Sequence, residues 1–268
     1  MFPKKSLGQN FLTNTGIVAS IVDAASLSSN ETVLEIGPGK GILTEELLKR
    51  GVKVIAVEKD RELIPILQKR FEKEIKEDSL ILINEDILTF QFPKSIEKYK
   101  LVANIPYYIT GQIIRQFLTA EKKPETMVLL VQKEVAERII ARDGKESLLS
   151  LSVKAYGTPI YIKTVKAGSF TPAPKVDSAI LLINNISRDF FSTFSLSRFN
   201  LDREKEKRFF EVLHAGFAHK RKQLFGNLKA VFDEKILREK MKEGNIPENT
   251  RAEDLSLDKW RGLSEISN

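Results

Sequence analysis

Residues 32–60 read TVLEIGPGKGILTEELLKRGVKVIAVEKD, and this stretch decides the fold. Two apolar runs, Thr32–Ile36 and Lys53–Val57, stand on either side of a segment with helical spacing. A strand–helix–strand unit of this kind joins two parallel strands of one sheet. The glycines before the helix, including Gly37 and Gly39, let backbone amides approach a ligand closely at a helix N-terminus. The stretch therefore predicts a parallel sheet with a ligand site at one edge.

The apolar runs continue along the chain. Three further candidate strands, at Leu80–Ile83, 100–103 and 126–131, are rich in Val, Ile and Leu and show little alternation, as is typical of strands buried on both faces. Residues 159–165 and Ser178–Asn184 lack an intervening helix and predict an antiparallel pair at the sheet edge. We expect a Rossmann-like α/β fold with a mostly parallel sheet of seven strands.

The last part of the chain changes character near Ile186. A polar linker, 187–201, carries no pattern that we can interpret, and four helical segments follow at 203–217, 222–231, Glu234–Glu243 and 253–263. We place a domain boundary between Ile186 and Ser187. Residues 1–186 are expected to form the α/β domain, and residues 187–268 a small all-α domain.

The amino-acid composition limits the kinds of partner and reaction that the protein can have. The chain has a formal net charge of +7, which favours nucleic acid as the partner, with a membrane surface second and plain solubility as the simple alternative. The absence of cysteine excludes disulfides, zinc knuckles, iron–sulfur clusters and a thiol nucleophile. His214 and His219 are the only histidines, so we expect no metal site. A reaction in which a cofactor carries the reactive group is favoured.

No segment predicts a membrane span or a secretion signal. No run of about 18 apolar residues occurs, and the first residues, MFPKKSLGQNFL, lack the apolar stretch of a signal peptide. We therefore expect a soluble, cytoplasmic protein that does not associate with membranes.

The glycine-rich loop differs from the one that binds dinucleotides. Ile42 stands where the G-x-G-x-x-G pattern has its third glycine, and E-x-G-x-G-x-G suits S-adenosylmethionine, which has no pyrophosphate. Glu58 ends the second strand, 21 positions after Gly37, where a carboxylate can accept two hydrogen bonds from ribose hydroxyls. A tight turn and a solvated strand-end charge are the alternatives.

The third strand also ends in acidic residues. Asp86 follows Leu80–Ile83 and can accept a hydrogen bond from the adenine amine of the cofactor, although its neighbour Glu85 could exchange roles with it. The carboxyl ends of parallel strands share one edge of a sheet. Ligand-type groups at three successive strand ends therefore predict one cofactor site.

The fourth strand ends in NIPYY, residues 104–108. The Asn104 side-chain oxygen and the Ile105 carbonyl, left unpaired by Pro106, can accept the hydrogens of an exocyclic amine and aim its lone pair at a methyl group. Tyr107 can stack on the base that bears the amine. The alternative is that the proline ends a strand and the tyrosines fill the core.

These motifs resemble the rRNA adenine N6,N6-dimethyltransferases. NIPYY and EIGPGKG carry the resemblance, and SLGQNFL and SFTPAPKVDS strengthen it, as do VQKEVAERI, FAHKRKQLFGNL and RAEDLSLDKW further along the chain. The resemblance implies a class I methyltransferase fold and S-adenosylmethionine as cofactor. It implicates Asn10 and Leu12, in a segment that closes over the cofactor, and gives Asn104 a cofactor contact as well. It also implies that Phe170 sandwiches a flipped adenine against Tyr107.

The family has two main branches. Lys40 and Ile105 lean towards the Erm-type enzymes of large-subunit (23S) rRNA, whereas Tyr108, Gly8 and RAEDLSLDKW lean more strongly towards the KsgA-type enzymes of small-subunit (16S) rRNA. The resemblance thus implies dimethylation of two adjacent adenosines near the 3′ end of 16S rRNA in a pre-30S particle, by a monomer acting in ribosome biogenesis. A non-catalytic RNA-binding assembly factor is the third possibility, and the intact Asn104 argues against it.

Basic clusters are the expected RNA contacts. Phosphate contacts position an RNA without reading its sequence. The candidates are Lys4, Lys5, Lys220, Arg221 and Lys222.

Overall fold

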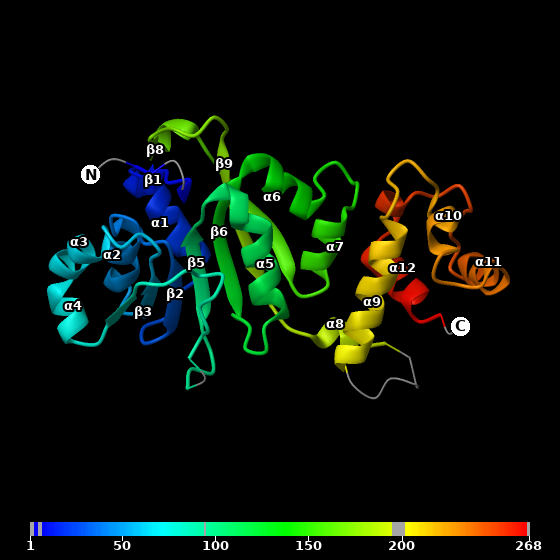
Figure 1. Ribbon diagram of the computed structural model, residues 1–268, viewed down its shortest axis with the longest axis horizontal. Helices are drawn as coiled ribbons and strands as arrows, with labels where there is room; N and C mark the ends of the chain where they lie inside the picture. The colour runs from blue at the N-terminus through cyan, green and yellow to red at the C-terminus, as the bar shows by residue number, and fades with distance from the viewer. Residues whose placement is uncertain (1–2, 5–6, 94, 195–201, 267–268) are drawn as a thin grey trace. The chain divides into compact units, whose positions relative to one another are not determined.

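The computed structural model describes residues 3–4, 7–93, 95–194 and 202–266, and its chain forms two compact units (Figure 1). The first unit contains Met1–Ala136 and Thr158–Ile186, and the second contains Glu137–Gly157 and Ser187–Asn268.

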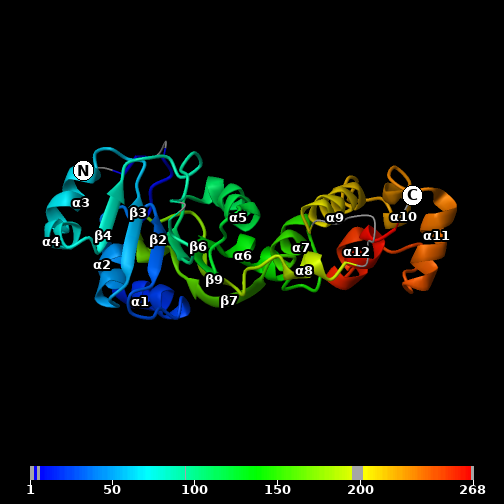
Figure 2. The same cartoon turned by 90° about the horizontal axis from the view of Figure 1, so that it is seen from below.

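A sheet of seven strands forms the centre of the first unit. The strands are β2 (Thr32–Ile36), β3 (Lys53–Val57), β4 (Leu80–Ile83), β5 (Lys100–Asn104), β6 (Thr126–Gln132), β7 (Thr158–Val165) and β9 (Ser178–Asn184). Their order is β4-β3-β2-β5-β6-β9-β7, and Figure 2 shows them side by side with β4 at one edge. The first five strands are parallel, and β9 pairs antiparallel with both β6 and β7. The predicted fold, including its antiparallel edge, is confirmed.

Helices cover the sheet. They are α1 (Thr15–Ala24), α2 (Ile42–Lys49), α3 (Ile64–Arg70), α4 (Glu72–Lys76), α5 (Thr110–Thr119) and the start of α6 (Lys133–Ile140). Apolar residues of α1, α2 and α3 share one core cluster with every second residue of the central strands, such as Val33, Val54 and Val102. Side chains of successive strand residues point to opposite faces, so this cluster is the core on one side of the sheet. It holds the strand ends in register.

A second, two-stranded sheet joins distant parts of the sequence. Phe11–Leu12 (β1) pairs antiparallel with Phe170–Thr171 (β8), and Leu12 lies opposite Phe170. A 3₁₀ turn, Ala167–Ser169, precedes β8. The pairing was not predicted, and it brings together the SLGQNFL and SFTPAPKVDS segments.

The second unit is helical. It contains α7 (Leu148–Lys154), α8 (Asp189–Ser192), α9 (Asp202–Gly216), α10 (Leu224–Leu228), α11 (Glu234–Glu243), a 3₁₀ turn (Ala252–Asp254) and α12 (Leu257–Ser264). The helix expected over 222–231 is shorter, and the one expected over 253–263 begins as the 3₁₀ turn. Trp260 of α12 is fully buried and stacks on Phe217.

The chain passes between the units at three points. One of them lies between Ile186 and Ser187, where the sequence suggests a domain boundary. The segment Glu137–Gly157 groups with the second unit, because α7 packs against α9. The division into domains 1–186 and 187–268 stays a prediction. Part of the linker, residues 195–201, lies outside the described residues.

No helix among the described residues is long and apolar enough to cross a membrane.

Candidate active site

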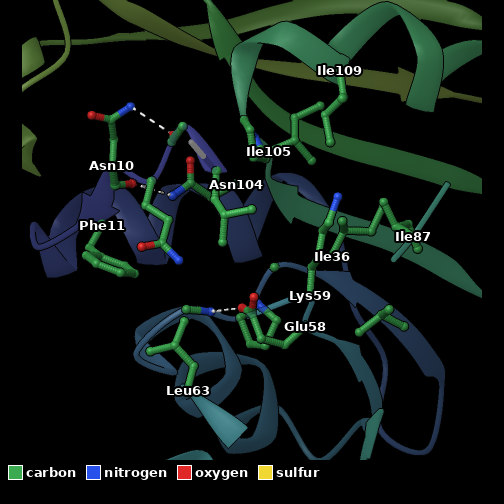
Figure 3. Close-up of a pocket in the computed structure, with 18 of the residues that line it drawn as sticks. Asn10, Phe11, Ile36, Glu58, Lys59, Leu63, Ile87, Asn104, Ile105 and Ile109 are labelled. Atoms are coloured by element: carbon green, nitrogen blue, oxygen red, sulfur yellow. Dashed lines mark hydrogen bonds between the residues drawn. The ribbon is translucent and has the colours of Figure 1, made fainter. Parts of the chain in front are cut away.

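A pocket lies at the carboxyl ends of β2, β3, β4 and β5, where the segment that leads into β1 also reaches it (Figure 3). The residues that line it all belong to the first unit, and they include five stretches of sequence: Leu7–Leu12, Ile36–Lys40, Val57–Lys59, Glu85–Leu88 and Asn104–Ile109. The strand ends that the sequence singled out therefore meet in one place.

The glycine-rich loop has the backbone that its sequence predicts. Gly37 and Gly41 have φ angles of 67° and 84°, in the region that residues with a Cβ rarely adopt. A Cβ on Gly41 would lie 2.5 Å from Phe71 Cε2, whereas one on Gly37 would meet only the Asn104 carbonyl oxygen at 3.9 Å. Gly41 is thus needed for packing and helix entry, while the space at Gly37 is open to the pocket.

Two backbone N–H groups, one from the glycine-rich loop and one from the residues after β3, hold the Glu58 carboxylate in place. It is 6% exposed, its Oε2 accepts from the Gly39 N–H (3.1 Å) and its Oε1 from the Asp60 N–H (2.8 Å). Burial raises the pKa of Glu58, and the backbone hydrogen bonds oppose that rise. Because each carboxylate oxygen can accept two hydrogen bonds, both oxygens keep acceptor capacity for a diol.

Asp86 has a partner that sequence reasoning missed. Lys59 Nζ lies 2.8 Å from Asp86 Oδ2, and the Leu88 N–H donates to Asp86 Oδ1 at 3.1 Å. The hydrogen bond from Lys59 lowers the pKa of Asp86. Lys59 follows Glu58 directly at the end of β3, which was the available signal. Glu85 also lines the pocket.

The Asn104 amide is oriented by the segment that crosses the pocket. Its Nδ2 donates to the Asn10 carbonyl at 3.3 Å (Figure 3). No described residue donates a hydrogen bond to its Oδ1, so that oxygen can accept from a ligand. Ile105 is buried, and the Pro106 carbonyl accepts from the Ile109 N–H, which closes a 3₁₀ turn over Tyr107–Ile109.

Tyr107 and Phe170 occupy different environments. Tyr107 lines the pocket, and its hydroxyl lies 2.6 Å from the Ser178 hydroxyl oxygen; burial raises its pKa. Phe170 is 4% exposed, belongs to the core cluster and does not line the pocket. No ring contact joins Phe170 and Tyr107 among the described residues. The adenine sandwich therefore stays a prediction, and it requires Phe170 to leave its packed position.

Asn10 and Leu12 both line the pocket, and the cofactor contacts that the resemblance implies for them stay a prediction. Asn10 Nδ2 donates to the Gly8 carbonyl at 3.3 Å, and Leu12 is held by its pairing with Phe170. Tyr108 is 63% exposed at the pocket rim.

Glu35 is a buried acid that sequence reasoning did not assign. It lies on β2, is 0% exposed, and neither of its oxygens has a hydrogen-bond partner among the described residues. The hydroxyl and N–H of Thr44 on α2 face Glu35 without meeting ordinary hydrogen-bond geometry, and they favour its charged form. Burial raises the pKa of Glu35 to about 8.

The predicted RNA contacts fall into three groups. Lys4 Nζ lies 2.7 Å from Asp60 Oδ1 and 2.8 Å from Glu62 Oε1, so its ammonium is already paired. Lys5 lies outside the described residues. Lys220, Arg221 and Lys222 are exposed in the second unit between α9 and α10. In the part of the chain that the structure describes, no group of three or more His, Asp or Glu could hold a metal ion.

Comparisons with known proteins agree with this geometry. Residues 3–268 match the family described as "Ribosomal RNA adenine dimethylase". A protein of Dehalococcoides mccartyi named "Ribosomal RNA small subunit methyltransferase A" is 41% identical over 97% of this chain and 87% of its own length. The Fusobacterium nucleatum protein of the same name is 36% identical over 98% and 97%.

Two solved structures share the whole fold. A dimethyladenosine transferase from Plasmodium falciparum is 28% identical, with a TM-score of 0.78 over 94% of this chain and 95% of that one. The 23S rRNA methyltransferase ErmE is 25% identical, with a TM-score of 0.77 over 96% and 98%.

Proposed function

The chain belongs to the ribosomal RNA adenine dimethylase family, and on this basis we propose that it dimethylates the N6 amines of two adjacent adenosines near the 3′ end of small-subunit rRNA. S-adenosylmethionine is the proposed methyl donor. The small-subunit assignment is supported by the names of relatives that are more similar in sequence than the large-subunit enzyme is. We further propose that the substrate is a pre-30S particle and that the protein acts on it as a monomer in the cytoplasm.

One observation carries the proposal: four successive strand ends deliver their ligand-type groups to a single pocket. Gly37, Glu58, Asp86 and Asn104 follow β2, β3, β4 and β5 and all line it. A crevice at the carboxyl ends of parallel strands is where open α/β sheets bind their ligands. If the proline only ended a strand and the tyrosines only filled the core, these groups would have no reason to meet in one pocket.

The residues fit S-adenosylmethionine. The space beside Gly37 is open, Glu58 has acceptor capacity for the ribose hydroxyls, and Asp86 can accept from the adenine amine. When bound, the cofactor supplies an electrophilic methyl group. Asn10 and Leu12 would cover it from the side of the N-terminal segment. Lys59 would keep Asp86 ionised and therefore able only to accept.

Asn104 and Ile105 would hold the target amine. Their oxygens would accept its two hydrogens, which points the nitrogen lone pair away from both acceptors and towards the cofactor side of the pocket. The Asn10 carbonyl fixes which end of the Asn104 amide faces the substrate. Tyr107 would stack on the base, a contact worth about 1–3 kcal/mol. The base must leave its RNA stack to reach this position.

The decisive test is methyl transfer to purified small-subunit particles and, separately, to large-subunit rRNA. We expect N6,N6-dimethyladenosine, detected by mass spectrometry, only in the small-subunit RNA. Asn104→Ala should lower the single-turnover rate by about 10²–10³-fold, as loss of an oriented polar group at a reacting centre does, while S-adenosylmethionine still binds. Transfer to large-subunit rRNA alone would favour the Erm-type function, and cofactor binding without any transfer would favour the assembly factor.

A further inference from the structure

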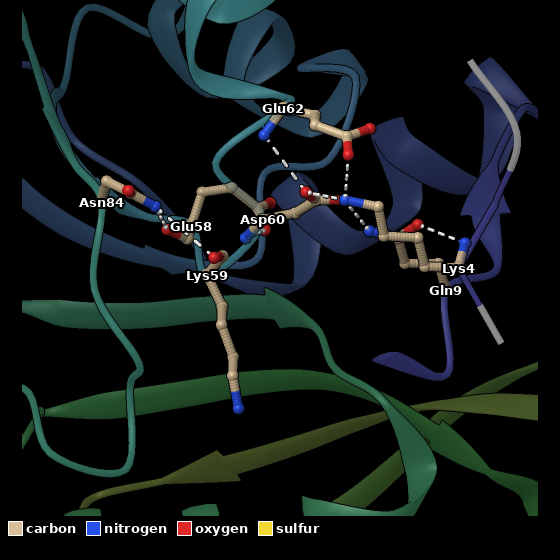
Figure 4. Close-up of polar contacts among 7 residues, drawn as sticks. All are labelled: Lys4, Gln9, Glu58, Lys59, Asp60, Glu62 and Asn84. Carbon is tan, nitrogen blue, oxygen red and sulfur yellow. Dashed lines mark hydrogen bonds and ion pairs between the residues drawn. The ribbon is translucent and has the colours of Figure 1, made fainter. Parts of the chain in front are cut away.

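Asp60 lies behind the proposed ribose carboxylate and touches it through the backbone. Its N–H donates to Glu58 Oε1 at 2.8 Å, so the position of Asp60 helps to set the position of Glu58. The Asp60 side chain points away from this contact towards the N-terminal segment (Figure 4). It is 3% exposed, so its charge must be satisfied inside the protein.

The Asp60 carboxylate accepts from the nearby Glu62 N–H at 3.2 Å and from two side chains that lie more than fifty positions away in the sequence. Lys4 Nζ donates to Oδ1 at 2.7 Å, and Gln9 Nε2 donates to Oδ2 at 2.8 Å. Gln9 also accepts from the Lys4 N–H at 2.8 Å, which ties the two donors to each other. Burial opposes the charged form of Asp60, but the hydrogen bonds from Lys4 and Gln9 outweigh it and lower its pKa.

These contacts fasten one end of a segment that crosses the pocket. We call residues 3–4 and 7–12 the N-terminal strap. Its other end is β1, where Phe11 and Leu12 are buried and pair with β8. Between the two ends, Leu7–Leu12 line the pocket, and the Asn10 carbonyl holds Asn104.

The two ends of the strap differ in strength. The β1 end is held by main-chain pairing and by apolar burial in the core cluster. The Asp60 end is held only by side chains, and the side chain of Lys4 is 33% exposed. An exposed partner weakens an ion pair, because water competes for it. The Asp60 end is therefore the end that can open without disturbing the core.

We propose that Asp60 is a positioning residue that latches the N-terminal strap to Glu58, and that opening of this latch controls the entry and release of S-adenosylmethionine and of its demethylated product. The inference rests on the proposed function, because it assumes which ligand the pocket holds. Dimethylation needs two cofactor molecules for each adenosine. The latch must then open at least once between the two transfers to one base.

A buried charge is a suitable latch. Only Asp60 is buried, and an ion pair with a partly exposed lysine adds little to stability, so the pair is better explained by specificity than by stabilisation. Here the pair specifies one position for a segment whose other attachments are the pairing of β1 with β8 and the hydrogen bond between the Asn10 carbonyl and Asn104. Asp60 also links this position to Glu58, because its N–H donates a hydrogen bond to the Glu58 carboxylate.

The experiment measures how fast radiolabelled S-adenosylmethionine leaves the full-length protein when unlabelled cofactor is added in excess. Lys4→Met and Asp60→Asn should each speed dissociation about fivefold, since a weaker latch raises the fraction of time in which the strap is open and the cofactor can leave. Lys4→Arg should restore a rate close to that of the unchanged protein. Lys145→Met is the matched control, because it breaks an ion pair with Asp254 in the second unit, and neither residue lines the pocket.

A second readout needs no cofactor. Hydrogen exchange at the backbone amides of the strap should be faster in Lys4→Met and Asp60→Asn than in the unchanged protein, with exchange in β2 and β3 unaltered. If the unchanged protein binds no S-adenosylmethionine, the proposed function fails. If it binds and transfers methyl groups, but the two variants release cofactor and exchange strap amides at its rates, the latch is wrong and the function stands.

Discussion

Two carboxyl groups on neighbouring strands show how their surroundings set their protonation. Glu58 accepts two backbone N–H groups, which favour its charged form against the effect of burial. Glu35 is fully buried, and neither oxygen makes a hydrogen bond of ordinary geometry with a described residue; Thr44 only partly opposes the effect of burial. An unpaired charge there would be costly, so Glu35 is expected to be protonated at neutral pH. Of these two carboxyl groups, Glu58 is the one suited to accept hydrogen bonds from a ligand.

Glu35 should make the stability of the protein depend on pH. Its pKa is about 8 in the folded state and 4.5 ordinarily, so the folded protein binds the extra proton. The contribution of Glu35 to the free energy of unfolding should be largest below about pH 4.5. It should fall as the pH rises from there through about 8. Glu35→Gln should remove this fall and be more stable than the unchanged protein near pH 9.

Urea unfolding at a series of pH values measures this effect. Glu77→Gln, at an exposed position at the end of α4, serves as the matched control and should leave the pH profile as it is. A profile with the same slope in the unchanged protein and in Glu35→Gln would show that Glu35 is not the group responsible.

At the scale of elements, patterns that extend over several neighbouring residues predict well, and contacts between distant residues do not. β2, β3, β4 and β9 have the predicted bounds, because each is a short and largely apolar run. β2, β3 and β9 are mostly buried, whereas Ile81 of the edge strand β4 is exposed. β1 and β8 have two residues each, too few for any periodicity, and their pairing spans the first unit.

In the site, too, the sequence predicts local features but not the contacts between distant side chains. Strand-end residues such as Glu58 and Asn104 could be predicted, because the order of strands fixes where their ends meet. The pairing of Lys59 with Asp86, and of Lys4 with Asp60, depends on how side chains reach across the sheet edge. Phe170 illustrates the reverse case, since its motif suggested a role in the pocket but the described structure packs its ring in the core.

Two glycines of one loop should have separable roles. Gly37→Ala places a Cβ in open space, so the cost to the free energy of unfolding should be about 1–2 kcal/mol for the left-handed backbone alone. Its methyl group would occupy space that the ligand needs, so S-adenosylmethionine should bind at least about tenfold more weakly, which corresponds to about 1.4 kcal/mol. Gly41→Ala adds a clash with the buried Phe71 ring, and its unfolding cost should exceed that of Gly37→Ala by about 1–3 kcal/mol.

Urea unfolding and isothermal titration with S-adenosylmethionine, done on both variants, separate these roles. Equal losses of stability in the two variants would contradict the assignment of Gly41 to packing. Unchanged cofactor affinity in Gly37→Ala would mean that the ligand does not approach the loop there.

At the scale of the whole molecule, the two units divide the proposed tasks. All residues that line the pocket belong to the first unit. The second unit carries the exposed run Lys220, Arg221 and Lys222, and none of the three forms an ion pair with a described residue. Free cations on the surface of a chain with net charge +7 are suited to phosphate contacts. RNA affinity and cofactor affinity should therefore respond to different substitutions.

Replacing Lys220, Arg221 and Lys222 together with Gln should weaken RNA binding without changing the affinity for S-adenosylmethionine. Each lost phosphate contact lowers the slope of log K against log salt concentration by about 0.7–0.9, so the slope should fall by about two to three if all three residues contact phosphates. Filter binding of small-subunit rRNA between low and moderate salt gives the slope. The matched control replaces three exposed lysines of the first unit, Lys69, Lys73 and Lys76, with Gln. Because both triple variants lose the same net charge, an equal fall in slope for the two would mean that overall charge, and not the basic run of the second unit, holds the RNA.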